Sequence, residues 1–77
     1  MNFNVVVLPD FKRDSKRLIK KYPSLSGEIH ELIRDLENNP AQGAALGSDC
    51  YKIRLAISSK GKGKSGGARV ITCVKIE

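Results

Sequence analysis

The chain has 77 residues, of which 40% are hydrophobic and 29% charged, and its formal net charge is +6 at pH 7. This length allows one small domain with a thin core, over residues 1–77, and the composition excludes a disordered tail. No apolar run approaches the ~20 residues of a membrane-spanning helix, and the first residues lack the layout of a signal peptide. We therefore expect a cytoplasmic protein without membrane association.

Residues 3–8 form an apolar run rich in Val and predict a strand that ends at Pro9. Asp10 can cap a helix over about residues 11–22, whose apolar positions fall on one face. The remaining positions of this helix are largely basic: Lys12, Arg13, Lys16, Arg17, Lys20 and Lys21. A solvated basic face and a surface for RNA or ribosome contact both fit this pattern.

Pro23 ends the first helix, and Ser24 or Ser26 can cap a second one that stops before Pro40. The apolar positions of the second helix have the clearest periodicity in the chain: Leu25, Ile29, Leu32, Ile33 and Leu36. Because the turn between the helices is short, we expect an antiparallel pair. His30 lies one position off the apolar stripe, where a boundary histidine is more common than a catalytic one.

Two alternating segments follow a loop at residues 41–49. Residues 50–58 alternate strictly and predict a half-buried strand, and residues 68–76 predict a second strand. The glycine- and lysine-rich loop at residues 59–67 joins them into an antiparallel hairpin. We therefore predict an α+β fold in the order β-α-α-β-β, with two N-terminal antiparallel helices packed on a small antiparallel sheet.

The alternation also predicts which side chains of the hairpin face the helices: Tyr51, Ile53, Leu55, Val70, Val74 and Ile76. The reverse face then collects Lys52, Arg54 and Arg69 on a sheet surface that no helix covers. A slip of one residue in the register would destroy this arrangement.

The charge of the chain is concentrated in its second half. Residues 1–40 hold seven Lys and Arg against six Asp and Glu, whereas residues 41–77 hold seven against two. This asymmetry favours a site for a polyanion in the second half, such as RNA, DNA or an acidic protein. A basic protein that is merely soluble is the alternative.

The two cysteines do not form a metal or redox motif. Cys50 and Cys73 lie far apart in the sequence, and the single His cannot complete a Cys/His zinc set at these spacings. We expect reduced thiols, as in most cytosolic proteins, and neither a metal nor a cofactor.

The predicted basic face suits a phosphodiester. RNA carries its own nucleophile, the 2′-OH, so a protein can cleave it without a metal by positioning the phosphate and moving protons. Arg54 and Arg69 would hold the phosphate, and Lys52 is the candidate base, because the pKa of a lysine falls near other cations. Three loop lysines border this face as candidate RNA-binding residues: Lys60, Lys62 and Lys64. Basic strands that only bind nucleic acid are at least as common.

Three segments carry a family resemblance: FKRDSKRLIKKYPSL at residues 11–25, ELIRDLENNP at residues 31–40 and YKIRLAISSKGKGKSGGARVIT at residues 51–72. In this order they resemble the RelE/HigB-type toxins of bacterial type II toxin–antitoxin modules, within the RelE/ParE superfamily. The resemblance implies a metal-independent mRNA endoribonuclease, or mRNA interferase, that inhibits translation on the ribosome. It also implies a cognate antitoxin protein as partner.

The resemblance assigns the basic catalytic positions of the family to Lys52 and Arg54 in YKIR and to Arg69 in GGAR. Members of the family usually continue into a further strand with an additional arginine and a proton-transfer residue, and this sequence ends at Glu77 before that region. We therefore expect an open edge on strand 68–76, which would accept an antitoxin strand or form a homodimer. The alternatives are an inactive or truncated relative that only binds antitoxin or nucleic acid, and a ParE-like gyrase inhibitor.

Overall fold

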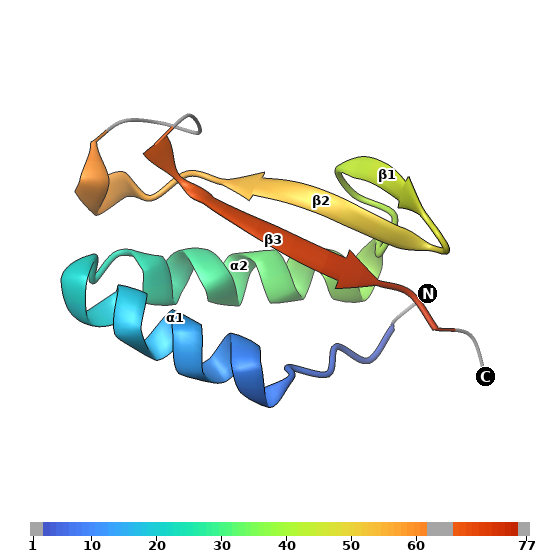
Figure 1. Ribbon diagram of the computed structural model, residues 1–77, viewed down its shortest axis with the longest axis horizontal. Helices are drawn as coiled ribbons and strands as arrows, with labels where there is room; N and C mark the ends of the chain where they lie inside the picture. Colours follow the sequence, from blue (N-terminus) through green and yellow to red (C-terminus); the bar gives the residue numbers. More distant parts are fainter. Residues whose placement is uncertain (1–2, 62–65, 76–77) are drawn as a thin grey trace.

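The computed structural model describes residues 3–61 and 66–75. Its elements are α1 (Pro9–Lys21), α2 (Leu25–Asn38), β1 (Ala44–Gly47), β2 (Cys50–Leu55), the 3-10 helix η1 (Ser58–Lys60) and β3 (Ala68–Cys73). The strands form an antiparallel sheet in the order β1-β2-β3, and the helices lie in a second layer beneath it (Figure 1). The fold is α+β, as predicted, but the helices precede the whole sheet.

The predicted N-terminal strand is wrong. Residues 3–8 are extended, and their side chains alternate between half-buried and exposed, but no strand pairs with them. The Phe3 N–H donates a hydrogen bond to the Glu37 carbonyl oxygen at 2.7 Å, at the end of α2, and Val5 packs against the core. The period of two therefore reflects a segment that buries alternate side chains against the helices, which requires no neighbouring strand.

Both helices form where their apolar spacing predicts them. Helix α1 begins at Pro9, because proline lacks an N–H and its fixed φ suits the first helical position. Asp10 consequently lies in the first turn and does not cap the helix. Ser24 is the N-cap of α2, and the two helices run in opposite directions (Figure 1).

Strand β1 lies within the region predicted as a loop. It pairs with β2 through a tight turn at Ser48 and Asp49, which have positive φ values of 51° and 59°. Two central residues with positive φ are characteristic of the type I′ turn that best matches the twist of a hairpin. Gly43, just before β1, packs so closely on β2 that an added Cβ would meet the Lys52 carbonyl oxygen.

The core lies between α2 and one face of the sheet. Leu32 and Leu36 of α2 form a buried cluster with Val70 of β3, and four half-buried side chains pack against it: Val5, Phe11, Ile53 and Leu55. The predicted core face of β2 and β3 is thereby confirmed for Ile53, Leu55 and Val70. Helix α1 has no buried residue. The core is thin, as expected for a domain of this size.

The register of β2 and β3 decides which groups share the outer face. Arg54 lies opposite Arg69, and Cys50 lies opposite Cys73. The Val74 N–H donates to the Asp49 carbonyl oxygen at 2.9 Å, so this neighbouring pair is hydrogen-bonded. Hydrogen-bonded and non-hydrogen-bonded pairs alternate along an antiparallel ladder. Both the Cys50–Cys73 pair and the Arg54–Arg69 pair are therefore of the closer, non-hydrogen-bonded kind.

Both strands of this hairpin are shorter than predicted. Strand β2 ends at Leu55 because the chain then turns into η1, and β3 ends at Cys73. Val74 is half-buried, and Ile76 lies outside the described residues. Among residues 3–61 and 66–75, no strand pairs with the outer edge of β3.

Candidate anion-binding site

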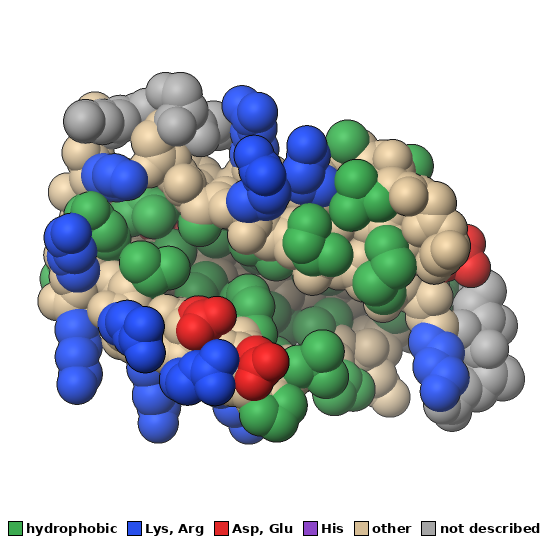
Figure 2. Space-filling model, in the orientation of Figure 1, with side chains coloured by type: hydrophobic (Ala, Val, Ile, Leu, Met, Phe, Trp, Pro, Cys, Tyr) green, Lys and Arg blue, Asp and Glu red, His purple; other side chains and the backbone are tan. Residues whose placement is uncertain are grey.

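Three basic side chains form a row on the outer face of the sheet. Arg54 and Arg69 are directly opposite each other, and Lys52 lies two residues from Arg54 on the same face. Arg54 and Arg69 are exposed, and Lys52 is half-buried. We call these three residues the basic row. Figure 2 shows Lys and Arg side chains gathered over the strands in the upper part of the view, separate from those along α1.

No acidic side chain among the described residues forms an ion pair with the basic row. Within residues 3–61 and 66–75, the ion pairs join Arg13 to Asp10 and Asp14 in α1, and none involves a residue of the row. Like charges directly opposite each other destabilise a sheet. A feature that opposes folding without a compensating contact is typical of a binding site. A bound anion would supply a negative charge that compensates the two opposed arginines.

A shallow groove of about 300 Å³ borders Arg54 on the side of the helices. It is lined by Glu28, Glu31, Leu32, Asp35, Arg54, Leu55 and Ala56. Its three carboxylates repel phosphate, so the groove does not extend the anion site. They therefore disfavour an anion on the helix side of Arg54.

Of the three candidate loop lysines, Lys60 lies within the described residues, and it is placed beside α1. The Nζ of Lys60 lies 5.5 Å from the centroid of the Tyr22 ring, and the Nζ of Lys21 lies at the same distance. Lys60 is therefore held beside the end of α1 by a cation–π contact. Lys62 and Lys64 lie outside the described residues.

Neither of two possible proton carriers shares the face of the row. Tyr51 pairs with Thr72 on the opposite face of the sheet. His30 is exposed on α2, and its Nδ1 lies 3.0 Å from the Ser26 carbonyl oxygen. The structure thus places His30 on the exposed side of α2, where the sequence predicted a boundary position. No group of three or more His, Cys, Asp or Glu in the described segments could hold a metal ion.

A hydrogen-bond network that the sequence did not suggest anchors the end of β2 to α2. The Glu28 carboxylate accepts bonds from the Ser58 hydroxyl at 2.6 Å, the Ser58 N–H at 2.9 Å and the Ser24 hydroxyl at 3.2 Å. The Ser59 N–H donates to the Ser24 hydroxyl oxygen at 2.9 Å. The bonds from Ser58, followed by that from Ser24, lower the pKa of Glu28, because they stabilise its charged form.

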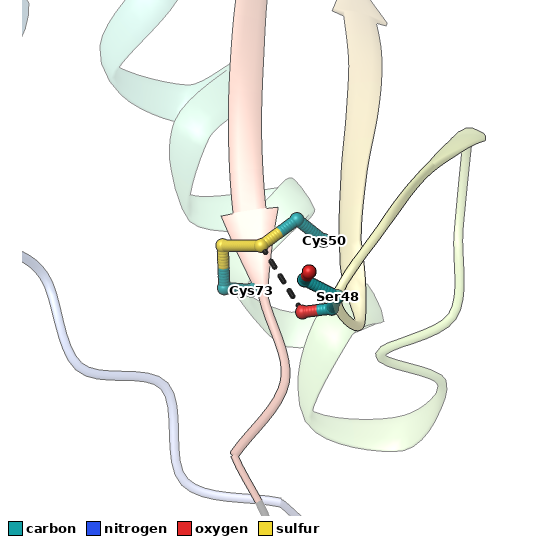
Figure 3. Close-up of a disulfide and its surroundings, with 3 residues drawn as sticks. All are labelled: Ser48, Cys50 and Cys73. Atoms are coloured by element: carbon teal, nitrogen blue, oxygen red, sulfur yellow. Dashed lines mark hydrogen bonds between the residues drawn. A yellow bond between two sulfur atoms is a disulfide. The ribbon is translucent and has the colours of Figure 1, made fainter.

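The expectation of free thiols is wrong. Cys50 and Cys73 form a disulfide, with their Cα atoms 4.0 Å apart (Figure 3). The cysteines face each other across the ladder and project from the same face as the basic row. The alternation of the sequence already placed each on its strand's basic face, but only the register shows that they are opposite each other. The Cys50 Sγ also lies 3.5 Å from the Ser48 carbonyl oxygen.

None of the helices among residues 3–61 and 66–75 is both long enough and apolar enough to cross a membrane. Comparisons with family models, with curated proteins and with solved structures found no match to the chain.

Proposed function

We propose that the protein binds RNA through the basic row and is a RelE/HigB-type toxin that cleaves ribosome-bound mRNA. The observation that carries this proposal is the pair of Arg54 and Arg69, which lie directly opposite each other with Lys52 beside them. Neither arginine forms an ion pair with a described carboxylate. Guanidinium groups bind phosphate with two parallel hydrogen bonds, and two of them can hold one phosphate from both sides. This function would place the protein in the cytoplasm.

In the proposed reaction, the two arginines hold the scissile phosphate and stabilise the extra negative charge of its pentacoordinate transition state. Lys52 in its neutral form accepts the proton of the 2′-OH, whose oxygen attacks phosphorus. The bond from phosphorus to the 5′ oxygen breaks, and water donates a proton to that leaving oxygen. The products are a 2′,3′-cyclic phosphate and a 5′-OH, and the reaction uses no metal or cofactor.

A binding-only relative is the second candidate. It is favoured by the absence of Tyr51 and His30 from the face of the row, because efficient cleavage requires a positioned proton donor as well as a base. Such a protein would retain affinity for RNA or for an antitoxin without cleaving mRNA.

The proposed partners follow from the same surface. An acidic antitoxin would compete with RNA for the basic row. The outer edge of β3, with which no described strand pairs, would accept one of its strands. Without an antitoxin, the same edge would support a homodimer. The ribosome would present the mRNA.

Primer extension on a translated mRNA after brief induction of the protein tests the proposal. We expect new 5′ ends in codon register with the wild type. We expect none with Arg69→Ala, because this variant lacks one of the two arginines that hold the phosphate. Arg34→Ala is the matched control, because Arg34 is exposed on α2 and makes no ion pair among the described residues. Uncut mRNA in cells that contain folded wild-type protein would favour the binding-only relative. Cleavage by Arg69→Ala would exclude the proposed role of Arg54 and Arg69 in holding the phosphate.

A further inference from the structure

The disulfide and the basic row occupy one face of the same two strands. Along the β2–β3 ladder, the non-hydrogen-bonded pairs on this face are Cys50–Cys73, Lys52–Ile71 and Arg54–Arg69. A covalent bond therefore closes one end of the face, and two like charges repel each other at the other end. The four ladder steps between them span roughly 13 Å.

We propose that the Cys50–Cys73 disulfide is a redox switch that sets the affinity of the basic row for RNA. This inference rests on the proposed RNA binding and adds its regulation. The oxidised form is the high-affinity state, because the cross-link holds β3 in register against β2. The reduced form is the low-affinity state.

The position of β3 makes the cross-link effective. The strand lies at the edge of the sheet, and no described strand pairs with its outer side. Of its residues, Val70 alone is buried, while Arg69, Ile71 and Cys73 are exposed. With the disulfide open, the ladder frays more easily at its Cys73 end. The repulsion between the guanidinium groups favours separation of the strands at the Arg69 end.

Both arginines contact a phosphate only while β3 is paired with β2. Apparent affinity scales with the populated fraction of the binding-competent state. A cross-link that suppresses opening of β3 therefore raises the affinity without adding a contact to the RNA.

The disulfide is accessible to thiol–disulfide exchange. Cys73 is exposed at the end of β3, so a thiolate of a small dithiol can attack its Sγ. The bond between the two protein sulfurs then breaks, and Cys50 leaves as a thiolate that takes a proton from water. The second thiolate of the reagent displaces Cys73, which gives two protein thiols and an oxidised, cyclic reagent. An oxidised small disulfide reverses the reaction.

The reduced state has a partner for the released thiol. The Cys50 Sγ lies 3.5 Å from the Ser48 carbonyl oxygen (Figure 3). A sulfur in a disulfide carries no proton, so this contact becomes a hydrogen bond only after reduction, when the Cys50 S–H can donate. The two chemical states of the switch therefore have different local contacts.

The test measures binding of a fluorescein-labelled single-stranded 12-mer RNA by anisotropy at low salt. Oxidised protein, protein reduced with dithiothreitol, and the double variant Cys50→Ser/Cys73→Ser are compared, with intact mass confirming the redox state. We expect the oxidised form to bind three- to tenfold more tightly than the reduced form. The double variant should bind like the reduced form and should not respond to dithiothreitol.

The outcomes separate the switch from the proposed function. Equal affinity of the oxidised and reduced forms would overturn the switch and leave RNA binding intact, whereas RNA binding by neither form would overturn both. Circular dichroism of the reduced protein is the second measurement. A reduced protein that has lost its helices would show that the disulfide is a structural cross-link only, and would also overturn the switch.

Discussion

The guanidinium groups of Arg54 and Arg69 illustrate how a single pair of residues can oppose folding and support binding. They face each other at a close position of the ladder, and no described carboxylate forms an ion pair with either. A pair of like charges at such a position costs about 0.2–1 kcal/mol. A phosphate between the groups would reverse the sign of this interaction.

We therefore predict that Arg54→Gln and Arg69→Gln each raise the free energy of unfolding by about 0.2–1 kcal/mol at low salt. The double variant should gain little beyond either single variant, because one substitution already removes the repulsion. Urea denaturation of the four proteins measures this coupling. The differences should disappear in 1 M salt, where the Debye length is about 3 Å. Additive gains would show that the two charges do not interact.

At the scale of single elements, two glycines have opposite roles. Gly27 lies within α2, and a Cβ at this position would meet no atom within 4 Å. Gly43 has φ +89° and lies against the Lys52 carbonyl oxygen and the Ile53 side chain. Gly27 therefore has room for a side chain, whereas the absence of a side chain at Gly43 allows β1 to begin beside β2.

Gly27→Ala should raise the free energy of unfolding by about 0.5–1 kcal/mol, because alanine loses less backbone entropy in a helix. Gly43→Ala should lower it by about 1–3 kcal/mol, because alanine is strained at positive φ and its Cβ clashes with β2. Thermal or urea unfolding of both variants provides the comparison, with each serving as the control for the other. A Gly43→Ala protein as stable as the wild type would contradict the close approach of β1 to β2.

The sequence predicts some of these elements well because the pleat of a strand fixes a period of two. This period alone correctly separates Ile53 and Val70 from the basic row. It also suggested a strand at residues 3–8, where the alternation comes from packing against the helices. Strand β1 could not be predicted, because its sequence AALG contains no β-branched residue and its pairing depends on the turn at Ser48 and Asp49.

The site was predictable in its composition but not in its register. The sequence placed Lys52, Arg54 and Arg69 on one face, but it did not show that the two arginines are opposite each other. Which residues are opposite each other depends on the number of residues in the loop between the two strands. The disulfide was missed for the same reason, because without the register the expected reducing compartment outweighed the shared face.

At the scale of the whole molecule, a disulfide and a hydrogen-bond network supplement the thin hydrophobic core. The disulfide encloses β2, η1 and β3 in a loop with a sequence separation of 23, which by loop-closure entropy contributes about 3 kcal/mol. The Glu28 network joins the start of α2 to η1. The first link is independent of protons over the acid range, whereas the second depends on a charged carboxylate.

The stability of the molecule should therefore fall in acid partly through Glu28. Because the folded state lowers its pKa, the charged network stabilises the protein above the ordinary carboxylate value of 4.5, and this contribution is lost as the pH falls through the folded pKa. Melting temperatures measured from pH 7 to pH 3 should show Glu28→Gln below the wild type at pH 7 and close to it at pH 3. Glu31→Gln is the control, since Glu31 is exposed on the same helix and forms no ion pair among the described residues, so its substitution should show no such convergence.

The covalent loop between Cys50 and Cys73 also determines how the chain responds to mechanical force. When the oxidised protein is pulled by its two ends, tension passes through the disulfide and bypasses the residues between the cysteines. The segment with the basic row then cannot be stretched, although α1 and α2 unravel. An unfolding machine that threads one chain at a time through a narrow pore would meet a doubled chain at Cys50 or Cys73, and reduction would restore a single chain.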